Sequence, residues 1–313
     1  MNDRFRSLHR ADHPLLLPNA WDFATGAALA QAGFPAIGTT SLGVAAAAGK
    51  PDAAGGTRAE TLALGRSLAR LPVPVTVDIE GGFSSRPEDV ARLVAELAGY
   101  GIAGVNLEDG RADGTLTPLD HQIEIVHAVK EAAPEVFLNA RTDTFWLGGG
   151  EPDRPETLRR VRAYADAGAD GVFVPAIVAE ADIRAVLDAV DVPLNVLFIP
   201  GKAEYARLAE LGVHRVSLGS LLFRRSLQAA VVAALETVAS APSLLHPTAP
   251  PNSGANGSGA NDSAEDGSSG NRSGEAGSGG DGSGEIGSGE AAGRSGTEFP
   301  VPSYQDIQNL LAP

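Results

Sequence analysis

The sequence predicts an α/β protein folded as a (β/α)8 TIM barrel, and three observations support this fold class. Short β-rich runs alternate with amphipathic helical runs through residues 14–240, a pattern typical of a parallel sheet covered on both faces. The strand–helix unit occurs eight times, which favours a closed barrel over an open doubly wound sheet. No strand is followed by the G-x-G-x-x-G motif that opens a dinucleotide-binding helix.

The expected strands are short runs rich in Val, Ile, Leu and Phe. In chain order they are residues 15–20, 36–41, 75–80, 104–109, 137–142, 171–176, 194–200 and 215–220. Between them, apolar residues recur at helical spacing, and in residues 87–101 they form a face of Val90, Leu93, Val94 and Leu97. Glycine adopts the left-handed conformation that closes many helices without a steric penalty. It stands at the expected helix ends Gly33, Gly101, Gly168 and Gly212.

The chain divides by composition into three parts. Residues 1–246 are expected to form the barrel. Residues 247–297 consist mainly of Gly, Ser and acidic residues, so they bury too little apolar surface to offset the entropy of ordering and predict a disordered linker. Residues 298–313 regain apolar spacing and predict a short helix that docks on the barrel, with one apolar face formed by Tyr304, Ile307, Leu310 and Leu311.

Composition and charge argue against several classes of function. The formal net charge of −15 disfavours nucleic acid or an anionic membrane as a partner. The sequence has no cysteine, so it has no disulfide framework, thiolate metal site or cysteine nucleophile. The sequence contains no run of about eighteen apolar residues, so we expect no membrane-spanning helix. The charged N-terminus lacks the apolar core of a secretory signal. We therefore expect a cytoplasmic protein.

Charged residues gather at the carboxyl ends of the predicted strands, where the active sites of such barrels lie. "VDIE" supplies Asp78 and Glu80, "LED" supplies Glu108, and "NART" supplies Arg141. A buried charge is costly unless it is paired, and a hard cation such as Mg²⁺ prefers carboxylate oxygens. Arg141 would bind a substrate carboxylate through its planar fork, although a structural salt bridge to Glu108 or Asp143 is the alternative.

Other polar residues at the strand ends have less specific interpretations. Asn106 and Asn195 are candidates for binding the substrate. Asp22 and Asp109 are interpreted as a helix cap or a turn residue. A metal chelated by a 2-oxo acid would stabilise the enolate that forms when a bond at C3 breaks, so this layout predicts an enzyme.

Five motifs resemble the isocitrate lyase/phosphoenolpyruvate mutase superfamily, in its phosphoenolpyruvate mutase-like branch. They are "LPNAWD", "GTTSLGVAAAAGKPD", "VDIEGGF", "GVNLEDG" and "NARTDTF", in this order. The resemblance implies a barrel of the phosphoenolpyruvate-binding type and Mg²⁺ or Mn²⁺ as cofactor. It also implies a small 2-oxo or 2-hydroxy carboxylate or a phosphonate as substrate, and a homodimer or homotetramer. The final "YQDIQNLL" resembles the short helix that closes many members.

The resemblance assigns the metal-binding residues one by one. Asp78 matches the direct metal ligand of the D-x-[DE] motif. Glu80 matches the second acid of that motif. Glu108 matches the acid that holds the metal through water.

The resemblance also assigns the residues that face the substrate. Thr40, Ser41 and Leu42 match the loop that binds the substrate carboxylate through a hydroxyl group and backbone N–H groups. Asp52, in "GKPD", matches the acid that faces the metal-bound substrate in the mutases. Arg141 matches the arginine that holds the far anionic group of the substrate.

The loop after the fourth predicted strand departs from the named activities. Isocitrate and methylisocitrate lyases carry a Lys-Lys-Cys-Gly-His loop, and the phosphonomutases carry a lysine there, but this chain has "EDGRADGTLTPLDHQ". The lysines of this chain lie outside the loop, and its cationic residue is Arg111. We interpret Arg111 as an exposed, solvated side chain. We expect a carbon–carbon lyase or decarboxylase first. The alternatives are a phosphonomutase, a phosphonate hydrolase or a non-catalytic metabolite-binding barrel.

Overall fold

One parallel sheet runs through the computed structural model, which describes residues 1–147, 153–238 and 300–311. Its strands pair in the order β1-β9-β8-β7-β6-β5-β4-β3-β2, so strands that follow each other in the chain are mostly neighbours. They are β1 (Leu15–Leu17), β2 (Asn19–Ala20), β3 (Ile37–Thr39), β4 (Val75–Asp78), β5 (Gly104–Glu108), β6 (Phe137–Arg141), β7 (Gly171–Val174), β8 (Leu194–Leu197) and β9 (Arg215–Ser217).

A divided strand closes the barrel. The predicted strand 15–20 is split at Pro18, which has no N–H group for a strand ladder. Its first half, β1, pairs with β9, and its second half, β2, pairs with β3, so the two ends of the sheet meet in one short segment. The N–H of Gly38 donates to the carbonyl of Pro18 at 2.9 Å. The predicted (β/α)8 barrel is confirmed, with one strand in two pieces.

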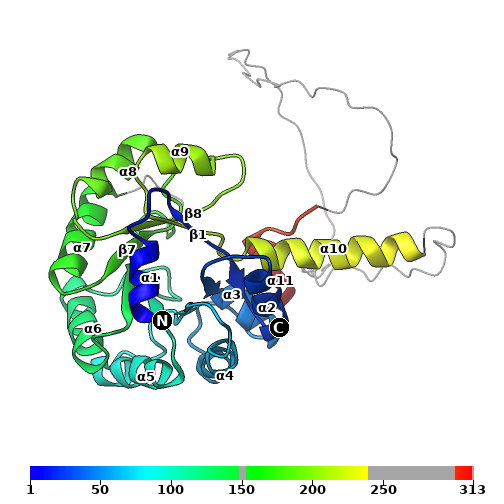
Figure 1. Cartoon of the computed structure of the whole chain (residues 1–313), viewed down its shortest axis with the longest axis horizontal. Helices are drawn as coiled ribbons and strands as arrows, with labels where there is room; N and C mark the ends of the chain where they lie inside the picture. The colour runs from blue at the N-terminus through cyan, green and yellow to red at the C-terminus, as the bar shows by residue number, and fades with distance from the viewer. Residues whose placement is uncertain (148–152, 239–299, 312–313) are drawn as a thin grey trace, which may run out of the picture. The chain divides into compact units, whose positions relative to one another are not determined.

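Helices follow the strands and lie around the outside of the sheet, as α5, α6 and α7 show (Figure 1). The predicted helix-closing glycines, Gly33, Gly101, Gly168 and Gly212, have φ values of 96°, 96°, 97° and 87°. The helices are α1 (Asn2–Leu8), α2 (Phe23–Gln31), α3 (Ser41–Ala47), α4 (Arg58–Leu68), α5 (Pro87–Tyr100), α6 (Leu119–Ala132), α7 (Arg154–Asp166), α8 (Glu180–Leu187), α9 (Tyr205–Glu210), α10 (Leu221–Thr237) and α11 (Tyr304–Leu311). Within the described ranges, none of them is long and apolar enough to cross a membrane.

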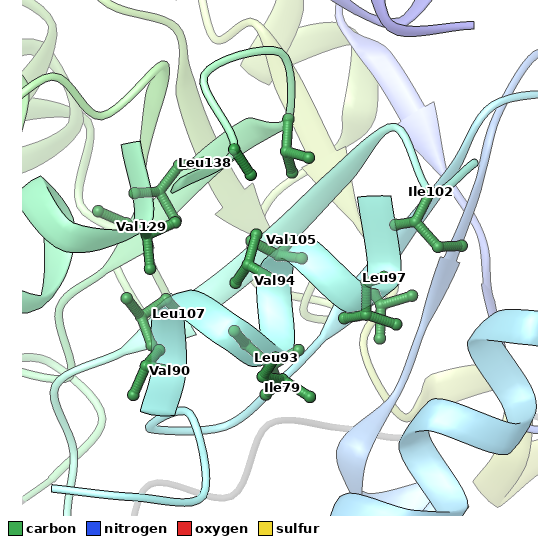
Figure 2. Close-up of a cluster of buried hydrophobic side chains, with 14 of the residues drawn as sticks. Ile79, Val90, Leu93, Val94, Leu97, Ile102, Val105, Leu107, Val129 and Leu138 are labelled. Atoms are coloured by element: carbon green, nitrogen blue, oxygen red, sulfur yellow. The ribbon is translucent and has the colours of Figure 1, made fainter. Parts of the chain in front are cut away.

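The largest hydrophobic core cluster among the described residues lies between the sheet and helices that include α4, α5 and α6 (Figure 2). The predicted face of α5 is fully buried, and its side chains pack with Val105 and Leu107 of β5. Burying a Leu or Val side chain stabilises the fold by about 1.5–3 kcal/mol. This packing fixes the positions of β4 and β5, whose carboxyl ends carry Asp78 and Glu108.

The C-terminal helix α11 packs beside α3. Residues 300–311 belong to the same compact unit as residues 1–231. Ile307 is buried in a cluster with Leu42 and Phe223. Leu310, predicted on the same face, is 72% exposed, because the contact stripe of α11 runs through Tyr304, Ile307 and Leu311. The predicted linker 247–297 lies outside the described residues.

The core of α5 supplies a first prediction. Leu97→Ala should lower the free energy of unfolding by about 2–5 kcal/mol, because it removes a fully buried side chain and leaves a cavity. The control, Leu310→Ala on the exposed side of α11, should change it by less than about 0.5 kcal/mol. Urea unfolding followed by circular dichroism measures both, and equal losses would contradict the assignment of the core.

Candidate active site

A cavity of about 100 Å³ opens at the carboxyl ends of the strands. Side chains from the ends of β3 to β9 line it, together with Tyr304 of α11. Among the residues expected at the site, the cavity is lined by Thr40, Ser41, Leu42, Asp52, Asp78, Asn106, Glu108 and Arg141. The structure therefore brings residues from the segment after β3 and from the ends of β4, β5 and β6 into one space.

Arg141 lies among the acids of the cavity and is almost buried. Its Nη1 lies 2.8 Å from Oε2 of Glu108, and its Nε donates to Oδ1 of Asp143 at 2.6 Å. The guanidinium also lies over the rings of Trp146 and Phe173, at 5.8 Å and 5.6 Å from their centroids. Both salt bridges named as the alternative role of Arg141 are thus present.

The cavity carries more negative than positive charge. Asp52, Asp78, Glu108 and Asp143 line it together with Arg111 and Arg141. Burial raises the pKa of Asp78 and of Glu108, and Arg141 opposes the shift in both. Repulsion from neighbouring acids raises the two pKa values further. A bound cation would relieve this repulsion.

Glu80, the third predicted metal ligand, does not line this cavity. Its backbone is left-handed, with φ of 50°, and its carboxylate reaches the loop before α4. There Oε1 accepts a hydrogen bond from Oγ1 of Thr57 at 2.6 Å, and Oε2 accepts the N–H of Gly55 at 3.1 Å. Glu80 lines a neighbouring hollow that Glu108 also borders.

Of the three predicted carboxylate ligands, Asp78 and Glu108 line this cavity, and Glu80 lines the neighbouring hollow. In the described part of the chain, no group of three or more His, Asp or Glu side chains is arranged to hold a metal ion. Asp78 and Glu108 share the cavity, which suits an ion that keeps several water ligands.

Asn195 lies in the barrel interior and does not line the cavity. It neighbours Arg215 across β8 and β9. Arg215 is fully buried, and its Nη2 donates to Oδ1 of Asn106 at 2.9 Å. Asn139 donates to the same oxygen at 2.9 Å, so Asn106 is held in place from two sides. The sequence analysis missed Arg215, whose only signal is a charged residue at the start of a predicted strand.

Asp109 is a buried ion-pair partner, which corrects its interpretation as a cap or turn residue. Its Oδ2 accepts hydrogen bonds from Nη1 of Arg160 at 3.0 Å and from the hydroxyl of Tyr164 at 2.6 Å. Its Oδ1 accepts the N–H of Asp143 at 2.8 Å, so it holds the segment that positions Arg141. Asp22, in contrast, caps α2 as expected.

Asp52 is held by the C-terminal helix, which the sequence analysis did not place in the site. The hydroxyl of Tyr304 donates to Oδ2 of Asp52 at 2.9 Å. Oε1 of Gln308 accepts the backbone N–H of Asp52 at 3.3 Å. Burial raises the pKa of the Asp52 carboxyl, whereas the hydrogen bond from Tyr304 and the Ser41 hydroxyl favour its ionised form.

Comparison with known proteins identifies the family. A model of the phosphoenolpyruvate phosphomutase family matches residues 5–239. A Mycobacterium tuberculosis protein is 44% identical over 230 residues, which cover 74% of this chain and 87% of that protein. The 2-methylisocitrate lyase of Bacillus subtilis is 32% identical over 226 residues, covering 68% of this chain and 73% of the enzyme.

The fold and the motifs lead to the same family. The crystal structure of phosphoenolpyruvate phosphomutase from Streptomyces platensis subsp. rosaceus superposes with a TM-score of 0.69. The two chains are 27% identical, and the match covers 76% of this chain and 87% of that one. This chain belongs to the phosphoenolpyruvate phosphomutase family, within the isocitrate lyase/phosphoenolpyruvate mutase superfamily.

Proposed function

We propose that this chain is a metal-dependent lyase or decarboxylase that cleaves a carbon–carbon bond of a small 2-oxo or 2-hydroxy carboxylate. One observation carries the proposal: the cavity at the strand ends combines several carboxylates with the guanidinium of Arg141. The 32% identity to the 2-methylisocitrate lyase of Bacillus subtilis supports a lyase as the class of enzyme.

The donor set suits a hard divalent cation, Mg²⁺ or Mn²⁺. Asp78 and Glu108 would hold the ion together with water, because Mg²⁺ commonly takes only one or two carboxylates. Glu80 would keep its hydrogen bonds to Thr57 and Gly55. When bound, the ion supplies positive charge that stabilises a developing enolate oxygen on the substrate.

The remaining residues would orient the substrate and move protons. Arg141 would bind one substrate carboxylate, and the hydroxyl and N–H groups of Thr40 to Leu42 would bind the other. Nη1 of Arg141 is paired with the Glu108 carboxylate, so Glu108 would compete with the substrate for the guanidinium. Asp52 lines the cavity and its pKa is raised by burial, which suits a group that accepts and returns a proton.

A phosphonomutase is the second candidate, and the similarity to the Streptomyces phosphomutase favours it. Arg111 lines the cavity from the segment that carries a lysine in the phosphonomutases. Arg141 would then hold a phosphonate instead of a carboxylate.

A substrate panel tests the function. Oxaloacetate, 2-methylisocitrate, 2,3-dimethylmalate and phosphonopyruvate are each incubated with the protein and Mg²⁺, and products are followed by nuclear magnetic resonance. We expect cleavage of one of the carboxylates, and loss of that activity with excess EDTA. Turnover of phosphonopyruvate alone would establish the second candidate. Binding without turnover of any compound would indicate a metabolite-binding barrel.

Two carboxylate variants test the metal site. Asp78→Asn should weaken Mg²⁺ binding by about tenfold or more, because it removes a charged ligand, as measured by calorimetry. Its melting temperature should stay at or above that of the wild type, because it removes the cost of burying a charge, which is the largest cause of the raised pKa of Asp78. The matched control is Glu80→Gln, which should bind Mg²⁺ nearly as well as the wild type. Equal losses in both variants would place Glu80 in the metal site.

Arg141→Lys tests the substrate site. The variant keeps the charge but loses the planar fork, so kcat/KM should fall about tenfold to a hundredfold, the equivalent of about 1.5–3 kcal/mol. Melting temperature is measured beside the kinetics, because Arg141 also bonds Glu108 and Asp143. A destabilised variant with unchanged kinetics would leave Arg141 a purely structural role.

A further inference from the structure

The C-terminal helix α11 contributes the polar side chain of Tyr304 to the cavity, beyond the apolar packing of Ile307. Tyr304 lines the cavity, and its ring lies edge-on to Trp146 with centroids 5.6 Å apart. Gln308 follows one turn later, and its Nε2 donates to the hydroxyl of Tyr304 at 3.0 Å. The Tyr304–Asp52 hydrogen bond joins residues 252 positions apart in the chain. Helix α11 therefore supplies part of the cavity wall.

The hydrogen bonds around Asp52 give this carboxylate one orientation. Tyr304 binds Oδ2 and Gln308 binds the backbone N–H, so both contacts from α11 hold the same residue. The other oxygen, Oδ1, is buried and lacks a hydrogen-bond partner within the described residues. Asp52 lines the cavity, so α11 fixes a carboxylate that borders the space for a substrate.

The groups around Asp52 affect the ionisation of its carboxyl in opposite directions. Tyr304, Ser41, Arg141 and the backbone N–H of Ala53 favour its ionised form. Repulsion acts between Asp52 and its acidic neighbours Asp78, Glu80 and Glu108. The pKa of Tyr304 is itself raised by burial and by Asp52, so its hydroxyl stays protonated and remains a donor.

We propose that Tyr304 is a positioning residue that fixes the Asp52 carboxylate at the substrate cavity, so that the C-terminal helix completes the active site. This inference rests on the proposed lyase function. In cleavage of a 2-hydroxy acid, the carboxylate of Asp52 takes the hydroxyl proton as the carbon–carbon bond breaks. The electron pair of that bond stays on the leaving carbon, which then receives the proton from Asp52. The carboxylate is regenerated and no further reactant is consumed.

Kinetics of full-length variants test this role. Tyr304→Phe keeps the ring against Trp146 and should lower kcat about tenfold or more with little change in KM or melting temperature. Leu310→Ala, on the exposed side of the same helix, should behave as the wild type. In an Asp52→Asn background, Tyr304→Phe should cause no further loss, because both changes remove the same function. Unchanged kcat in Tyr304→Phe, or losses that multiply in the double variant, would overturn the proposal.

A second measurement needs no turnover and separates this inference from the proposed function. The pKa of Asp52 is followed by carbon-13 nuclear magnetic resonance of aspartate carboxyls, with its signal assigned by its absence in Asp52→Asn. Tyr304→Phe should raise this pKa, because the lost hydrogen bond favours the ionised form. If the wild type cleaves none of the carboxylates, the proposed function fails, and the titration alone decides the inference. An unchanged pKa would overturn it.

Discussion

The cavity depends on Arg141, whose positive charge compensates the buried carboxylates around it. Its guanidinium bonds Glu108 and Asp143 at once, while Asp52 and Asp78 share the same enclosed space. Removing one partner of a buried pair typically costs about 3–5 kcal/mol, because the other charge is left uncompensated. A substrate carboxylate that takes Arg141 from Glu108 would free that acid for a cation. Anion and cation binding at this site are therefore expected to support each other.

Arg141 is also positioned indirectly, by polar contacts that hold its partner Asp143. Arg160 and Tyr164 on α7 bind Asp109 at the end of β5, and Asp109 binds the backbone N–H of Asp143. Each contact crosses from one strand–helix unit to the next. The geometry of the cavity thus depends on the register of β5, β6 and α7 as much as on the residues that line it.

The parts of this structure that follow from local chemistry could be predicted from the sequence. Helical spacing in residues 87–101 and acids at strand ends are local patterns, and they located the barrel and the residues that share its cavity. Contacts between distant segments left no such pattern, which is why Tyr304 was not assigned to the site. The hydrogen bond from Thr57 to the Glu80 carboxylate is another contact between distant segments that no local pattern reveals. Periodicity alone also placed Leu310 on the wrong side of its helix, since spacing does not reveal where the neighbouring helix lies.

The divided strand at Pro18 has a consequence for how the chain folds. β1 pairs with β9, and Oδ1 of Asn19 accepts the N–H of Leu218 across 199 residues. During synthesis the N-terminal segment leaves the ribosome first, so β2 can pair with β3 long before β1 can meet its partner. Closing so long a loop is entropically costly and slow. Until then β1 presents an unpaired edge, the kind of surface on which chains aggregate. Barrel closure is thus expected to be the folding step until which a strand edge stays open to wrong partners.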